Sequence, residues 1–113
     1  MTLLAKRQER SIVPRMYYIT TAIDYTNGPP HIGHAYEKVL ADVLARWHRM
    51  KGEEVYFLTG VDQHGQKVQQ TAEKLGITPQ EHVNNITGQF LALWDRLGIS
   101  NDGWASTTDP RHK

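Results

Sequence analysis

Residues 16–22 read MYYITTA, residues 54–59 read EVYFLT, and residues 33–50 between them repeat apolar side chains at helical spacing. The two flanking runs are rich in aromatic and β-branched residues, which favour strands. The helical spacing is carried by Val39, Leu40, Val43, Leu44, Trp47 and Met50. A strand, a helix and a second strand in this order predict a βαβ unit with two parallel strands.

The same segment predicts where its side chains lie. We expect Trp47 in the core, and Lys38, Arg46 and Arg49 on a solvated helix face. Neither strand alternates strictly, so we expect a sheet that is covered on both faces. Residues 23–30 contain NGPP, which predicts an irregular loop because proline and glycine interrupt regular structure.

The second half of the chain predicts two further helices. Residues 66–75 form the first, which Gly76 stops. Thr78 can cap the second, with Pro79 at its first position and Glu81 completing a capping box. This helix carries Trp94 on its apolar stripe and ends at residue 98. We expect residues 101–113 to be irregular and residues 1–15 to form a flexible basic extension.

Composition excludes several classes of protein. The 113 residues carry 13 basic and 12 acidic side chains, so bulk charge does not indicate nucleic-acid binding. Cysteine is absent, which excludes disulfides, thiol catalysis and cysteine-ligated zinc within this chain. The apolar runs are too short to span a membrane. We therefore expect a cytoplasmic α/β domain.

Two loops contain most of the residues whose side chains could take part in catalysis or ligand binding. The first follows the first strand and contains Asp24, Tyr25 and the tetrapeptide His31-Ile32-Gly33-His34, and the second contains Asp62. Parallel strands leave a sheet at one edge, where ligands of open α/β sheets bind. The chain order therefore predicts that the two loops lie together.

The spacing of His31 and His34 at a helix start predicts a nucleotide triphosphate site. The helix amides favour an anion there, and two imidazoles add directed N–H donors. Gly33 would let a flat ring such as adenine approach the backbone. Two alternatives stay open: the histidines simply cap or solvate the helix, or they bind a metal ion, although the nearby acids do not complete a metal motif.

Asp62 and Tyr25 suggest an amino-acid ligand. A carboxylate at a strand end can pair with an ammonium group, and an N-cap or turn role is equally open. The Tyr25 ring offers a face to an apolar side chain, with ordinary loop packing as its alternative.

Five segments in order resemble the methionyl-tRNA synthetase family of class I aminoacyl-tRNA synthetases. They read YITTAIDY (18–25), NGPPHIGHAY (27–36), ADVLAR (41–46), TGVDQHGQK (59–67) and STTDPRHK (106–113). The leucyl, isoleucyl and valyl enzymes fit the fourth segment less well. The resemblance covers about residues 17–113 and implies the N-terminal part of a Rossmann-like, parallel-sheet catalytic domain over residues 16–113.

The resemblance implies ATP-dependent activation of methionine and its transfer to tRNA(Met) by a full-length protein. It implies that His31 and His34 bind the phosphates of ATP, supplied with Mg2+, and stabilise the transition state, with Gly33 against the adenine. It also implies that Asp62 holds the methionine ammonium, while Ile23 and Tyr25 line the side-chain pocket. No residue is assigned to a protein-bound metal.

The chain departs from the family in one residue and in its extent. The family usually has Pro or Tyr at the position of Asp24, where an acid could alter the loop or point to solvent. A second phosphate loop with a Lys-Ser core, an anticodon-binding domain and the cysteines of a zinc insertion are all absent. We therefore expect the N-terminal part of a synthetase that is inactive alone, with zinc only outside this chain.

Three other functions remain to be separated from this one. The first is a class I synthetase for another aliphatic amino acid, and the second is a non-catalytic nucleotide-binding fragment. The third is a small nucleotidyltransferase complete in one domain, which would need about five strands where the sequence predicts two.

Overall fold

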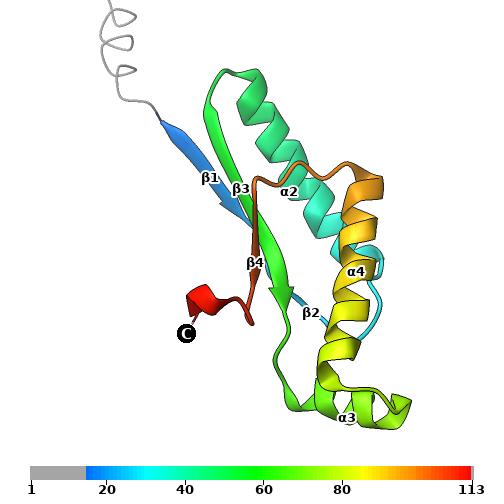
Figure 1. Cartoon of the computed structure of the whole chain (residues 1–113). Coiled ribbons are helices and arrows are strands. Elements are labelled where there is room, and N and C mark those ends of the chain that lie inside the picture. Colours follow the sequence, from blue (N-terminus) through cyan, green and yellow to red (C-terminus); the bar gives the residue numbers. More distant parts are fainter. Residues whose placement is uncertain (1–14, 113) are drawn as a thin grey trace, which may run out of the picture.

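The structure is a computed structural model that describes residues 15–112. The predicted extension over residues 1–15 therefore lies outside the described residues, apart from Arg15. The elements follow one another along the chain as shown in Figure 1. They are β1 (Met16–Thr20), β2 (Asp24–Tyr25), α2 (Ile32–Met50), β3 (Glu54–Asp62), α3 (Gln66–Leu75), α4 (Pro79–Leu97), β4 (Gly103–Ser106) and the 3-10 helix η2 (Pro110–His112).

Strand β3 is the centre of a four-stranded parallel sheet and pairs with β1, β2 and β4. The carbonyls of Leu58 and Asp62 accept amides from the segment that holds β1 and β2. The carbonyls of Phe57 and Val61 accept amides from residues 102 and 107, on either side of β4. Because successive carbonyls of a strand point to opposite edges, both edges of β3 are paired, and the predicted parallel α/β fold is confirmed.

The first strand was predicted over residues 16–22 and ends two residues earlier, at Thr20. Three larger differences concern β3, β2 and β4. β3 continues to residue 62 rather than ending at residue 59, β2 forms inside the predicted loop 23–30, and β4 forms inside the predicted irregular tail. The three differences have one cause. The extended end of β3 offers unpaired amides and carbonyls, and short segments without strong strand propensity pair with them.

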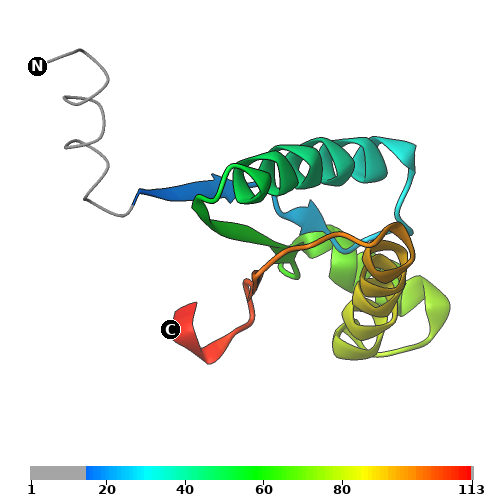
Figure 2. The same cartoon turned by 90° about the horizontal axis from the view of Figure 1, so that it is seen from above.

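Helix α2 covers one face of the sheet, as Figure 2 shows from above. Ala41 and Ala45 pack on Phe57 of β3, with Ile19 and Val55 at the edges of this cluster. Two alanines at the contact allow the helix to lie close to the strands.

The buried face of α2 is not the predicted apolar stripe. It consists of Lys38, Ala41, Asp42 and Ala45, which follow the spacing i, i+3, i+4, i+7. The prediction that Lys38 is solvated is wrong, because its side chain is fully buried, and the prediction that Trp47 is core is wrong, because it is 53% exposed. The expectation of a doubly covered sheet is also not met, since Tyr18 of β1 is exposed within the described part of the chain.

Polar contacts fasten the segment before β4 to α2. Asp42 accepts hydrogen bonds from the Ser100 amide (2.7 Å) and from Arg46 Nε (2.7 Å). Arg49 Nη2 lies 3.0 Å from Asp102 Oδ2, which also accepts the Phe57 amide at 2.8 Å. Arg46 is exposed, as predicted, and Arg49 is partly buried. Both help to hold the segment before β4 against α2.

Helix α4 packs beside the first turns of α2, and this arrangement is visible in both Figure 1 and Figure 2. Its buried residues Ile86, Phe90 and Trp94 form a second core cluster, which confirms the core position of Trp94. The predicted capping box is present, with Thr78 Oγ1 accepting the Glu81 amide at 3.1 Å. Gly98 ends the helix with φ +66°, a left-handed conformation that favours glycine.

The contact between β3 and β4 yields a stability prediction. A Cβ at Gly60 would lie 2.0 Å from the Ala105 carbonyl oxygen. Gly60→Ala should therefore lower the free energy of unfolding by about 1 to 3 kcal/mol. In Gly88→Ala, a Cβ in α4 meets nothing within 4 Å, and the change should raise that free energy by about 1 kcal/mol. Urea denaturation of both variants measures this, and equal effects would contradict the close β3–β4 approach.

Candidate functional site

The two predicted loops meet at the carboxyl edge of the sheet. Asp24 is in register with Val61, and Tyr25 is in register with Asp62. The amide and the hydroxyl of the fully buried Thr26 both donate to the Asp62 carbonyl, each at 3.0 Å. The prediction that chain order alone brings these loops together is confirmed.

His31 and His34 cap helix α2 with their own side chains. Nδ1 of His31 accepts the Gly33 amide at 3.1 Å, and Nδ1 of His34 accepts the His31 amide at 3.0 Å. The two rings stack with centroids 3.7 Å apart. A neutral imidazole whose Nδ1 accepts carries its proton on Nε2. Each histidine therefore offers an Nε2–H donor. The capping hypothesis is confirmed for both residues, and the role of their donors toward a phosphate stays a prediction.

Gly33 lies directly against the His31 side chain. A Cβ at residue 33 would lie 2.9 Å from Cε1 and 3.0 Å from Nδ1 of His31. The missing side chain thus makes room for the capping imidazole. Whether an adenine ring also approaches this backbone stays a prediction.

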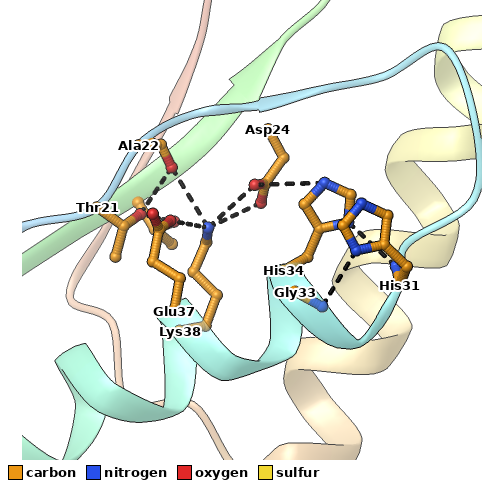
Figure 3. A network of polar contacts seen from close by, with 9 residues as sticks. Thr21, Ala22, Asp24, His31, Gly33, His34, Glu37 and Lys38 are labelled. Atoms are coloured by element: carbon orange, nitrogen blue, oxygen red, sulfur yellow. Dashed lines mark hydrogen bonds and ion pairs between the residues drawn. The ribbon is translucent and has the colours of Figure 1, made fainter.

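A buried network of charges lies directly behind His34 (Figure 3). Lys38 Nζ donates to the Ala22 carbonyl (3.3 Å), to Asp24 Oδ1 (3.1 Å) and to Glu37 Oε1 (2.7 Å). The same Nζ is 2.9 Å from Asp24 Oδ2, and Asp24 Oδ1 is 3.9 Å from His34 Nε2. Asp24 is only 6% exposed, so the structure excludes a position in solvent.

Burial lowers the pKa of His34 below its ordinary value of 6.5, because the charged imidazolium loses solvation. The Asp24 carboxylate opposes this shift, while His31 and Lys38 add to it by charge repulsion. His34 is thus held in its neutral, capping form around neutral pH.

The second loop holds the Asp62 carboxylate in place. Oδ1 of Asp62 accepts the His64 amide (3.1 Å) and the Thr107 hydroxyl (3.2 Å). The Thr107 hydroxyl in turn accepts the Gln63 amide at 2.8 Å. Among the hydrogen bonds of residues 15–112, none uses the other Asp62 oxygen.

Tyr25 crosses from the first loop to the second. Its hydroxyl occupies the place where a Cβ at Gly65 would stand, at 2.1 Å, and Gly65 has φ +136°. The register pairs Tyr25 with Asp62, and side chains of registered residues on neighbouring strands share a face. Tyr25 therefore lies beside Asp62, while Ile23 is 44% exposed just before β2.

Helix α4 connects the two loops from a third side. His82 Nε2 contacts the Asn27 carbonyl at 3.1 Å, and Gln63 Nε2 donates to Thr87 Oγ1 at 2.9 Å. The Phe90 ring meets His34 edge-on with centroids 5.0 Å apart. The site is therefore built by three elements, of which the sequence pattern indicated only the first two.

Sequence reasoning missed Lys38 and Thr107. The spacing of Lys38 with Ala41, Asp42 and Ala45 was a signal for a buried face, but the stronger apolar stripe obscured it. Thr107 comes from a segment about 45 residues after Asp62, and no local pattern links the two.

Residues 15–112 contain no group of three or more His, Asp or Glu side chains arranged to hold a metal ion. No helix in the same range is long and apolar enough to cross a membrane.

Comparisons with known proteins agree on one family. A family model described as "tRNA synthetases class I (M)" matches residues 17–113. The methionine–tRNA ligase of Deinococcus radiodurans is 51% identical over 100 residues, which cover 88% of this chain and 15% of that protein. The Rhizobium meliloti methionine–tRNA ligase is 54% identical over 96 residues, which cover 85% of this chain and 19% of that protein.

A solved structure shares the fold. Mycobacterium tuberculosis methionyl-tRNA synthetase bound by methionyl-adenylate superposes with a TM-score of 0.84 at 42% identity. The match covers 87% of this chain and 19% of that one. The chain thus spans less than a fifth of the length of each of these relatives.

The lowered pKa of His34 predicts a pH dependence of stability. Unfolded His34 takes up its proton near pH 6.5, before the folded form does, so falling pH favours the unfolded chain. The contribution is complete above pH 6.5 and is lost below it. His34→Asn, which keeps an acceptor for the His31 amide, should lose less stability between pH 7.5 and pH 5.5 than wild type. Urea titrations at both pH values measure this, and parallel losses would contradict it.

Proposed function

We propose, since this chain belongs to the methionyl-tRNA synthetases of class I, that the complete protein activates methionine with ATP and charges tRNA(Met). The observation that carries the proposal is the pair of histidine caps on α2, whose Nε2–H donors are free. They lie at the sheet edge that also holds Asp62, so one site offers donors for phosphate and a carboxylate for an ammonium group.

In the proposed reaction, the methionine carboxylate attacks the α-phosphate of ATP in line, and pyrophosphate leaves. The step needs positioning and charge stabilisation more than covalent help from the protein. His31 and His34 donate through Nε2 to phosphate oxygens, whose negative charge Mg2+ shares. Gly33 lies against the adenine, next to the imidazole that it accommodates.

The methionine site in this proposal uses the other loop. The free oxygen of Asp62 pairs with the methionine ammonium, and Thr107 and the His64 amide hold its second oxygen. Tyr25 and Ile23 line the pocket for the thioether side chain, to which aromatic and apolar surfaces are well suited.

The remaining parts of the proposal lie beyond these residues. tRNA(Met) is the acceptor of the methionyl group, and the protein acts in the cytoplasm. A cysteine-ligated zinc would be held outside residues 1–113, because this chain has no cysteine.

Pyrophosphate exchange tests the proposal directly. The complete protein should incorporate labelled pyrophosphate into ATP when methionine is present, and not with leucine, isoleucine or valine. The 113-residue chain alone should give no exchange, because it lacks a second phosphate loop with a Lys-Ser core. Exchange that follows another aliphatic amino acid would assign a different synthetase, and binding of ATP without any exchange would indicate a non-catalytic protein.

Two substitutions of His34 distinguish the role of its Nε2 donor from the role of its Nδ1 acceptor, which caps α2. Asparagine can replace the Nδ1 acceptor but not the Nε2 donor, so His34→Asn should lower kcat of exchange about 100-fold with little loss of stability. Glutamine can replace the Nε2 donor but not the acceptor, so His34→Gln should cost about 1 kcal/mol of stability and keep more activity. Exchange kinetics and thermal melts distinguish the two, and equal kcat values would contradict the donor role.

Thr107→Val tests the support of Asp62. Loss of the hydroxyl removes one of the two donors to Asp62 Oδ1 and leaves the Gln63 amide without its acceptor. KM for methionine should therefore rise about tenfold, while KM for ATP changes little. Thr71→Val is the matched control, since the Thr71 hydroxyl bonds only its own helix at Lys67. A rise confined to KM for ATP would show that Thr107 serves the other loop.

A further inference from the structure

The most unusual buried group in the described chain is the Lys38 side chain. It is fully buried, although lysine is among the residues that are least often found inside proteins. All three of its protons are used, by the Ala22 carbonyl, Asp24 and Glu37. The Trp94 ring closes the remaining side, with its centroid 5.3 Å from Nζ. Such a complete set of partners indicates a fixed charge rather than an accident of packing.

The partner of Lys38 is a carboxylate next to the histidine donors. Asp24 Oδ1 is 3.9 Å from His34 Nε2, which is too far for a hydrogen bond, although the carboxylate is the nearest charge to this N–H among the contacts of His34 within residues 15–112. The same oxygen is 3.1 Å from Lys38 Nζ, and the second oxygen is 2.9 Å from it. The carboxylate is thus drawn to Lys38 and leaves the Nε2–H of His34 without a partner.

An unbalanced carboxylate at this place would oppose the proposed reaction. It would repel the phosphates of ATP, and it would compete with them for the Nε2–H of His34. Phe90 packs edge-on against His34, and Trp94 lies over Lys38, so water screens these charges poorly. Glu37, the other acid near Lys38, adds further negative charge to the cluster.

We propose that Lys38 is a positioning residue of the ATP site, which balances the Asp24 carboxylate and keeps His34 Nε2 free to donate to a phosphate. The inference rests on the proposed function and extends it to two further residues. Asp24 and Lys38 act as a unit, so the site tolerates the acid at position 24 only while the lysine is present.

A double-mutant cycle in the complete enzyme tests the pair. Lys38→Met removes the balancing charge and should raise KM for ATP about tenfold, with KM for methionine changed less than twofold. Adding Asp24→Asn to Lys38→Met removes the repelling charge and should return KM for ATP to within about threefold of wild type. Lys74→Met, which changes an exposed lysine of α3, is the matched control and should leave both constants unchanged.

Each outcome decides the inference. A purely structural Lys38 would change both KM values together, without rescue by Asp24→Asn, and that result would overturn the proposal. If Lys38→Met fails to fold by circular dichroism, Asp24→Asn alone decides. It removes one negative charge near the phosphates and leaves the Lys38 ammonium paired with Glu37 alone, so KM for ATP should fall about twofold, and an equal or higher value would overturn the proposal.

The wild-type enzyme separates this inference from the proposed function. A wild type without methionine-dependent exchange would overturn the proposed function and this inference with it. An active wild type whose KM for ATP is unaffected by Lys38→Met would overturn this inference alone.

Discussion

The site depends on one constraint: the two residues of the short strand β2 pair in parallel with the last two residues of β3. It places Tyr25 beside Asp62 and turns Asp24 to the face that α2 covers. The neighbouring residues of one loop thus serve different purposes. Tyr25 belongs to the predicted methionine pocket, whereas Asp24 belongs to the charge cluster behind His34. A shift of one residue in this register would exchange the two side chains between the faces.

The elements that sequence predicted well are those whose boundaries carry their own signals. Helices α3 and α4 end at Gly76 and Gly98, and Thr78 with Glu81 starts α4, so each boundary is decided within a few residues. Strands β2 and β4 lack such signals. They exist because β3 supplies unpaired backbone groups far away along the chain, and this long-range context overrides weak local propensity.

In the candidate site, too, some features follow from local sequence and others depend on long-range packing. The meeting of the histidine tetrapeptide and Asp62 at one edge of the sheet was predictable, because the βαβ order brings their two loops together. The orientation of the histidines was not predictable, since it depends on which ring nitrogen accepts a helix amide. The burial of Lys38 depends on alanines, which make a close helix–sheet contact while contributing little to an apolar stripe. Spacing alone could not show which of two helix faces would meet the sheet.

The distance along the chain between β3 and β4 also has a consequence for synthesis on the ribosome. Leu58 pairs with Gly103, so β3 leaves the ribosome about 45 residues before the strand that completes its second edge. At common rates of translation this interval lasts roughly 2 to 9 s. Throughout this interval, the carbonyls of β3 that will later accept amides from the β4 segment have no partner strand. A nascent chain in this state can pair with other chains.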